Sequence, residues 1–346
     1  MIDMALTKDY QLASKKVRLI TDAEWTTVRT IVVEKRIIIV TDENLFNLYR
    51  EELKSYHKIV LAAGEASKTL QTVEYMIEQL LEAEADKDCY LIGFGGGVIT
   101  DITGYVASIY KRGMSFGYIP TSLMAMCDAA LGGKNGVNFG KFKNVAGTIN
   151  QPEFILFDYS LLKTLPADEW VNGIAEVIKH ACIFDELLFE MLEKNNLYQL
   201  QSDLTLTAFI IEKSIALKMK VVAEDETDVG NRRKLNFGHT IGHALERMHD
   251  IPHGHAISIG MIAACALSEK ITGLHFTEAA RIVKLLAKYN LPVDIDTDHK
   301  YIFNAIRADK KRTNNTISFV LLDKIGKAII RPVEMDYLKT YLKEIV

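Results

Sequence analysis

Histidines with the spacing of metal ligands stand near residue 240. His239 and His243 are four positions apart, so on a helix both imidazoles project from one face. His253 follows in the next turn, from which a third imidazole could fold back over that face. Three imidazole nitrogens leave one position open on a tetrahedral zinc ion, which is the arrangement of a catalytic site. The pattern therefore predicts a catalytic metal centre, with an upstream carboxylate as the remaining protein ligand.

A His-x-x-x-His pair also occurs as two partly buried helix histidines with satisfied hydrogen bonds, and spacing alone leaves both interpretations open. Gly238 and Gly242 favour the metal, because glycines beside the histidines leave room for a ligand to approach. Thr240 stands where HExxH zinc proteases have glutamate, so simple zinc proteolysis is disfavoured. His255 is a further imidazole that could compete as a ligand.

The composition is that of an ordinary globular protein. The chain has 346 residues, of which 49% are hydrophobic and 25% charged, and its formal net charge is −4. No basic run dominates a segment, so we expect neither nucleic acid nor an anionic membrane as the main partner. The four cysteines are far apart, which favours a reducing compartment over a disulfide scaffold. We read no signal peptide and no membrane span, so the expected location is the cytoplasm.

The elements that must position these side chains change character along the chain. The first half alternates β-rich runs with helical stretches, which is typical of a parallel α/β sheet. Strands are predicted at 36–40, 58–61, 89–92 and 116–119, and helices at 67–84 and 98–110. Later helices are predicted at 168–194, 204–223, 234–248, 256–272 and 277–289, followed by a hairpin of 316–322 and 327–330. We therefore predict an α/β domain over 1–160 and a mainly α-helical domain over 161–346.

A glycine cluster, Gly93 to Gly97, lies at a predicted strand-to-helix junction. Backbone N–H groups and the helix dipole at such a junction can hold a pyrophosphate. The alternative is a tight turn that needs glycine for a positive φ, since Val98 occupies the last glycine position of the G-x-G-x-x-G pattern. Asp101, early in the helix, could cap it or hold a ribose hydroxyl.

Two further segments combine charges and amides. The segments Asp128–Asn135 and Lys141–Asn144 read as a glycine-flexed loop with an acid, three lysines and two amides, suited to a polar, anionic ligand or simply solvated. Arg232, Lys234 and Asn236, just before the histidines, are candidate anion contacts.

Glu176 and Lys179 share a helix face at i, i+3. They form either a surface ion pair or the missing metal carboxylate with a lysine that contacts substrate.

Taken in order, these motifs resemble the 3-dehydroquinate synthase family of sugar-phosphate cyclases, from about Gly64 to about Leu322. The matching runs include Gly95-Gly96-Gly97-Val98-Ile99, Tyr110-Lys111-Arg112-Gly113, Gly132-Gly133-Lys134, Ala175-Glu176-Val177-Ile178-Lys179 and Leu235-Asn236-Phe237-Gly238-His239-Thr240. The resemblance implies a Rossmann-like NAD-binding α/β domain followed by a mainly α-helical metal-binding domain, in a homodimer.

The resemblance also implies roles for individual residues. The metal ligands are Glu176, His239 and His253, and His243 then supports a ligand or faces the substrate as a base. Catalytic roles fall to His243, Asp228, Lys179, Lys134 and Asn144. Substrate contacts fall to Arg112, Asp128, Lys134, Asn144, Lys179, Lys218, Arg232, Asn236, His243 and Lys310. Contacts with NAD fall to Gly64, Glu65, Lys68, Gly96, Gly97, Val98, Asp101, Thr121, Ser122, Lys134, Lys143, Leu161, Leu162, Lys163 and Thr164.

The implied reaction converts 3-deoxy-D-arabino-heptulosonate 7-phosphate to 3-dehydroquinate and phosphate, the second step of the shikimate pathway toward chorismate and the aromatic amino acids. It is a carbon–oxygen lyase reaction in which NAD is reduced and reoxidised. Zinc and cobalt suit the implied ligands alike.

Three rival functions are another cyclase that uses sedoheptulose 7-phosphate, a metal-dependent polyol dehydrogenase, and a non-catalytic binding protein. Arg232 and Lys134 can hold a carboxylate that sedoheptulose 7-phosphate lacks, which favours the shikimate-pathway substrate.

The chain departs from the family pattern at a few positions. Thr100 and Asn135 replace the usual glycine and threonine, and Asn138-Phe139-Gly140 replaces an Asn-His-Pro run. Asp228 stands where the family has a glutamate with an acid–base role. The shorter Asp228 carboxylate could fill that role through a water molecule, or the role would pass to His243.

Overall fold

The chain folds into two compact units. A computed structural model describes residues 6–140, 142–248, 251–294, 299–307, 312–313 and 315–345. Unit 1 comprises Met1–Leu165 and Lys218–Thr227, and unit 2 comprises Pro166–Leu217 and Asp228–Val346. No helix in the described part of the chain has both the length and the apolar character needed to span a bilayer.

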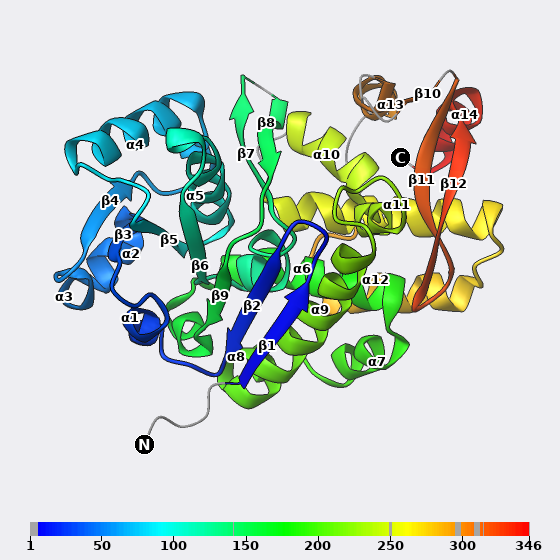
Figure 1. The fold of residues 1–346 in the computed structure, drawn as a ribbon. Coiled ribbons are helices and arrows are strands. Elements are labelled where there is room, and N and C mark those ends of the chain that lie inside the picture. The colour runs from blue at the N-terminus through cyan, green and yellow to red at the C-terminus, as the bar shows by residue number, and fades with distance from the viewer. Residues whose placement is uncertain are drawn as a thin grey trace. The chain divides into compact units, whose positions relative to one another are not determined.

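Unit 1 is built on a seven-stranded sheet with the order β1-β2-β9-β6-β5-β3-β4 (Figure 1). The strands are β1 (Leu6–Gln11), β2 (Lys16–Thr21), β3 (Arg36–Asp42), β4 (His57–Leu61), β5 (Cys89–Gly95), β6 (Ser115–Pro120) and β9 (Phe154–Phe157). Only β1 and β2 pair antiparallel within this sheet, which confirms the predicted parallel α/β architecture. The sequence pattern did not predict β1, β2 or β9; the residues of β1 are mostly exposed, and β9 has only four residues.

The helices of unit 1 follow their strands. Asp42, at the end of β3, caps the next helix by accepting backbone hydrogen bonds from Asn44 and Leu45 at 2.9 and 3.0 Å. The longer helices are α2 (Glu43–Leu48), α4 (Leu70–Glu82) and α5 (Gly97–Ile109). The short helical segments are η1 (Trp25–Thr27), α1 (Val28–Ile31), α3 (Arg50–Leu53), η2 (Glu65–Ser67), η3 (Tyr110–Arg112), η4 (Ala125–Ala129) and η5 (Tyr159–Thr164).

The predicted flexible loop from Asp128 to Asn144 is wrong for most of its length. Residues 134–139 and 142–149 form an antiparallel hairpin, β7 (Lys134–Phe139) and β8 (Phe142–Ile149), which packs along α5 (Figure 1). Gly136 pairs with Gly147 across this hairpin, and a Cβ on Gly136 would lie 2.8 Å from the carbonyl oxygen of Ala146. These glycines therefore permit close strand contact, whereas the sequence pattern suggested flexibility.

Unit 2 is mainly helical, as predicted. Its helices are α6 (Ala167–Phe184), α7 (Glu186–Lys194), α8 (Leu197–Ser202), the greater part of α9 (Leu204–Glu224), η6 (Asn231–Asn236), α10 (His239–Met248), α11 (His253–Ile271), α12 (Phe276–Lys288), α13 (His299–Arg307) and α14 (Met335–Ile345). Three short strands form a second sheet, β10 (Arg312–Thr313), β11 (Thr316–Lys324) and β12 (Lys327–Glu334). The predicted late hairpin is confirmed, with Gly326 at φ 81° in its turn.

Two predicted helices are wrong in their continuity. The helix predicted at 168–194 is interrupted at Asp185, which has extended backbone and caps α7 by accepting from the Leu188 N–H at 3.0 Å. The helix predicted at 234–248 begins only at His239, because Gly238 has φ 78° and separates it from η6.

A buried cluster anchors the histidine-bearing helices. Ile241 and Leu245 of α10 and Ala256 of α11 pack with Phe319 of β11 and Leu338 of α14. The helices α10 and α11 thus have fixed backbones on the side away from their polar residues.

Gly104 is the point of closest approach between α5 and its neighbours. A methyl group there would overlap the Tyr118 hydroxyl and the Asn135 side chain, which are hydrogen bonded to each other at 2.7 Å. We predict that Gly104→Ala lowers the free energy of unfolding by about 1–3 kcal/mol, measured by chemical denaturation. Helix propensity alone predicts the opposite sign, a gain of about 1 kcal/mol, so equal or higher stability would contradict the packing argument.

Candidate functional site

Three potential metal ligands of unit 2 converge on one point. Glu176 lies in α6, His239 is the first residue of α10, and His253 is the first residue of α11. The Oε1 atom of Glu176 is 3.1 Å from Nε2 of His253 and 3.6 Å from Nε2 of His239. One ligand atom from each residue lies within 4.8 Å of the other two.

The second nitrogen of each ring is engaged elsewhere. Nδ1 of His239 is 3.2 Å from the Phe237 carbonyl oxygen, and Nδ1 of His253 is 3.0 Å from Oε1 of Glu246. Both partners are acceptors, so each Nδ1 carries a proton, and Nε2 is the nitrogen of each ring that lies nearest Glu176 and could bind a metal. Such outer contacts fix the tautomer and the ring orientation of metal-binding histidines.

The two ligand histidines differ in their electrostatics. Burial, and then the nearby Lys179 ammonium, hold the pKa of His239 well below its usual value, so this ring is neutral. Burial opposes charge on His253 as well, but its hydrogen bonds with Glu176 and Glu246 outweigh burial and raise its pKa to about 9. The Glu176 and Glu246 carboxylates thus favour a positive charge on the His253 ring.

Glu176 and Lys179 form a buried ion pair. Their side chains are 0% and 1% exposed, and the Lys179 ammonium contacts Oε2 of Glu176. The surface ion pair that the i, i+3 spacing also suggested is therefore wrong. Burial of both charges costs desolvation, so the pair is retained at an energetic expense that a purely structural helix face does not require.

Glycines allow α11 to start against α6. The Gly254 N–H donates to the Asn172 side chain at 2.5 Å, and a Cβ on Gly254 would overlap the Asn172 backbone. Gly254 therefore lets the start of α11 lie close enough to α6 for His253 to reach Glu176.

His243 lies beside the three ligands. Its ring centroid is 5.0 Å from that of His239, so the predicted sharing of one helix face is confirmed. The nearest carboxylate oxygen is Oε2 of Glu246, at 4.0 Å. A second potential group joins His243, Glu246 and His253, and His255 belongs to neither group among the described residues. The set of one carboxylate and two imidazoles suits zinc or cobalt and leaves room for a further ligand.

The glycine turn of unit 1 leaves helix N–H groups without a side-chain cap. Gly96 is the N-cap residue of α5, and no described side chain accepts a hydrogen bond there. The alternative of a positive φ is wrong, since none of Gly93, Gly95, Gly96 and Gly97, all described, has one. A Cβ on Gly95 would instead lie 2.6 Å from the Ile99 side chain. The turn therefore needs glycine for space, which is compatible with anion binding at the helix start.

Two residues that follow the end of β6, Thr121 and Ser122, lie at the same turn. The Thr121 N–H donates to the Gly95 carbonyl at 3.0 Å, and a Cβ on Gly96 would come 3.4 Å from Oγ of Ser122. Val98 is half-buried in the first turn of α5. The structure thus brings together Gly96, Gly97, Val98, Thr121 and Ser122, as the family resemblance implies.

Asp101 pairs with Lys68 at 2.5 Å and does not cap α5. The two side chains are 16% and 6% exposed. Burial raises the pKa of the Asp101 carboxyl, although the Lys68 ammonium opposes this. The ion pair joins two residues that sequence analysis assigned separately to the nucleotide.

Asn138, which sequence analysis did not select, connects three predicted site residues. Its side-chain N–H donates to Glu65 at 2.8 Å, and its backbone N–H donates to the Lys68 carbonyl at 2.9 Å. Its side-chain oxygen accepts from the Asn144 N–H at 2.9 Å, where Asn144 has φ 54°. Only its place in the glycine-rich run hinted at this role.

The other predicted residues have these positions. Asp128, in η4, pairs with Lys218 at 2.7 Å. Lys134 on β7 and Lys143 on β8 are exposed, and so is Arg112, which has φ 65° in η3. Gly64 has φ 94° before η2, and Leu161, Leu162, Lys163 and Thr164 lie in η5.

The remaining predicted residues belong to unit 2. Arg232 is buried in η6, Asn236 ends η6, and Asp228 has φ 63°. Lys310 lies outside the described residues.

Asn135 does not serve as a ligand-binding amide of the predicted anion-binding loop. Its amide oxygen accepts from the Tyr118 hydroxyl, and its N–H groups donate to the Gly133 and Asn150 carbonyls at 2.9 and 2.8 Å. The side chain is thus engaged inside the fold.

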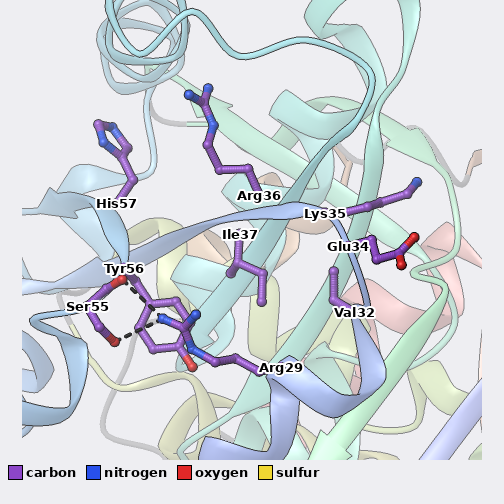
Figure 2. A pocket seen from close by; sticks show the side chains of 9 residues that line it. All are labelled: Arg29, Val32, Glu34, Lys35, Arg36, Ile37, Ser55, Tyr56 and His57. Atoms are coloured by element: carbon purple, nitrogen blue, oxygen red, sulfur yellow. Dashed lines mark hydrogen bonds between the residues drawn. The ribbon is translucent and has the colours of Figure 1, made fainter.

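A surface hollow of about 460 Å³ lies where β3 and β4 begin (Figure 2). Arg29 there donates to Ser55 and lies over the Tyr56 ring, 4.2 Å from its centroid. Figure 2 shows Lys35 and Arg36 pointing in different directions. Its cations do not converge on one ligand position, and none of its lining residues belongs to the predicted site.

The chain is similar to known proteins along most of its length. Family models described as 3-dehydroquinate synthase N-terminal and C-terminal match residues 58–172 and 173–312. A 3-dehydroquinate synthase of Pyrococcus furiosus is 39% identical over 317 residues, covering 89% of this chain and 92% of that protein. One of Campylobacter concisus is 40% identical, covering 86% and 87%.

Solved structures share the fold over nearly the whole chain. The 2-epi-5-epi-valiolone synthase of Streptomyces hygroscopicus, with NAD+ and Zn2+ bound, has a TM-score of 0.88 and 25% identity, covering 99% of each chain. A 2-deoxy-scyllo-inosose synthase complexed with carbaglucose-6-phosphate, NAD+ and Co2+ has a TM-score of 0.85 and 24% identity, covering 99% of this chain and 100% of that one.

The fold and the carboxylate–imidazole site thus define a protein of the sugar-phosphate cyclase class. Within that class, the chain belongs to the 3-dehydroquinate synthase family.

The ion pair of Lys68 and Asp101 gives a prediction on stability. Lys68→Met should lower the free energy of unfolding by about 3–5 kcal/mol, because it leaves a buried carboxylate without its cation. Urea denaturation measures this, and Lys68→Met combined with Asp101→Asn should recover part of the loss. If Lys68→Met alone is as stable as the wild type, the buried ion pair of Lys68 and Asp101 is contradicted.

Proposed function

We propose that this protein is a 3-dehydroquinate synthase that converts 3-deoxy-D-arabino-heptulosonate 7-phosphate to 3-dehydroquinate and phosphate. The observation that carries the proposal is the convergence of Glu176, His239 and His253, in a chain whose relatives of that name are 39–40% identical over 86–89% of its length. The proposal includes NAD and a divalent metal, zinc or cobalt, since neighbours of the same fold contain them.

Glu176, His239 and His253 would hold the metal through one carboxylate oxygen and two Nε2 atoms. A metal in this position lowers the pKa of a coordinated hydroxyl and polarises a carbonyl. Lys179 keeps an ammonium beside the Glu176 carboxylate, so a cation faces any anionic group that reaches the centre. His243, 40% exposed and next to the ligands, is the residue placed to move a proton as a base.

The uncapped start of α5 would hold the pyrophosphate of NAD. The N–H groups that follow Gly96 and the adjacent Thr121 and Ser122 supply donors to an anion. NAD supplies a reversible hydride acceptor. Asn138 would keep Glu65, Lys68 and Asn144 in fixed relative positions around this ligand.

The proposed reaction has no net redox change. One ring carbinol is oxidised transiently, which acidifies the neighbouring C–H, and phosphate leaves by β-elimination. The ketone is then reduced again, and the opened ring closes by intramolecular aldol addition. Arg232 and Lys134 would bind the substrate carboxylate, and Asp228 and His243 are the proposed acid–base residues.

A second candidate is a cyclase that acts on sedoheptulose 7-phosphate. The fold is shared with a 2-epi-5-epi-valiolone synthase at a TM-score of 0.88, so this fold accommodates more than one synthase activity. The second candidate needs no group for a substrate carboxylate, so a role of Arg232 in binding distinguishes the two. With either substrate we expect a homodimer in the cytoplasm.

The test is phosphate release from 3-deoxy-D-arabino-heptulosonate 7-phosphate with NAD and zinc or cobalt, with NADH absorbance followed in parallel. We expect stoichiometric phosphate, 3-dehydroquinate as the product and no lasting NADH. Lasting NADH would indicate a polyol dehydrogenase instead. No phosphate from this sugar acid, but phosphate from sedoheptulose 7-phosphate, would support the second candidate.

The metal assignment makes its own prediction. Glu176→Ala and His253→Ala should each lower metal affinity by more than the about 10–100-fold typical of losing an outer contact, because each removes a ligand. Metal content after dialysis, measured by mass spectrometry, checks this. His255→Ala is the matched control and should retain the wild-type metal content. Unchanged content in the first two variants would overturn the ligand set.

A further inference from the structure

Glu246 is a buried carboxylate that neither the motifs nor the proposed reaction uses. Its side chain is 1% exposed. It stands three residues after His243 and seven after His239 in α10, so all three lie on one helix face. The helix therefore directs this carboxylate toward the proposed metal centre and away from solvent.

The carboxylate lies between two imidazoles. Its Oε1 is 3.0 Å from Nδ1 of His253, within hydrogen-bond distance, and its Oε2 is 4.0 Å from Nε2 of His243. A carboxylate buried this deeply needs compensating donors, and the His253 ring supplies one of them.

The hydrogen bond decides which nitrogen of His253 faces Glu176. A carboxylate oxygen only accepts, so Nδ1 must carry the proton in this contact. Nε2 lies 3.1 Å from the Glu176 carboxylate, which is also within hydrogen-bond distance. A metal would displace the proton at Nε2, and the contact with Glu246 would keep the remaining proton on Nδ1 and hold the orientation of the ring.

The two ligand histidines are supported differently. His239 has a neutral backbone carbonyl, that of Phe237, at its Nδ1, whereas His253 has a charged side chain. A carboxylate at this position makes the opposite nitrogen more basic and strengthens its bond to a metal. His253 is also the more exposed ligand, with 30% of its side chain exposed against 11% for His239. Packing therefore fixes His253 less, and it depends more on its partner.

We propose that Glu246 is the positioning residue of the metal centre, which holds His253 with Nε2 directed at the metal and increases its basicity. This inference rests on the proposed function, because it assumes that Glu176, His239 and His253 bind a metal. It adds a residue that acts through a ligand and does not itself touch the metal.

The experiment measures Co2+ and Zn2+ affinity of the purified full chain by competition with a chelator, without substrate. Glu246→Ala removes the acceptor and its charge, and Glu246→Gln keeps an amide oxygen that can accept from Nδ1. Glu269→Ala, at an exposed glutamate of α11, is the matched control. The Co2+ absorption spectrum reports ligand geometry, and thermal melting of the metal-free proteins reports folding.

We expect Glu246→Ala to weaken metal binding by about 10–100-fold and to alter the Co2+ spectrum, with Glu246→Gln intermediate. The control should match the wild type. Wild-type affinity and spectrum in both Glu246 variants would overturn the proposal and leave the proposed function intact. A merely structural role would lower the melting temperature of the metal-free protein and leave the affinity of its folded form unchanged, which also overturns it. Absence of metal binding by the wild type would overturn the metal centre itself.

Discussion

A carboxylate without solvent exposure is the constraint around which unit 2 is arranged. Glu176 carries its charge in the middle of α6, and a charge buried in this way must be compensated. The compensation comes from the Lys179 ammonium, from the His253 ring, and in the proposed holoenzyme from a metal. Replacing this cluster with apolar residues would cost the fold nothing in principle, so the cluster itself points to chemistry.

The rest of the fold holds the donors where this carboxylate needs them. The buried cluster under α10 and α11 fixes the backbones of both histidine helices. Gly254 lets α11 begin against Asn172 of α6, and Gly238 ends η6 so that His239 can open a new helix. In unit 1, parallel strands deliver the Gly95–Gly97 turn and Thr121 to one edge of the sheet, which leaves an anion-binding helix start.

Sequence patterns predicted the parallel sheet, the helical second half and the late hairpin, since hydrophobic periodicity is a local property. They failed where a specific side-chain or strand contact decides. Asp185 reads as an ordinary helix residue until its side chain caps α7, and the hairpin of β7 and β8 was hidden by glycines that serve close pairing. Spacing placed Glu176 and Lys179 on one helix face but could not tell a surface pair from a buried one. Glu246 acts through the His253 side chain across the break between α10 and α11, and Asn138 acts through the distant Glu65 and through backbone groups, for which no residue pattern exists.

The central claim is that Glu176, His239 and His253 bind one metal together, and X-ray absorption at the zinc edge of the zinc-loaded protein tests it most directly. The account predicts two imidazole nitrogens at about 2.0–2.1 Å with oxygen completing the shell, and the loss of one imidazole in His253→Ala. A zinc ion without imidazole scattering, or a spectrum that His253→Ala leaves unchanged, would contradict it.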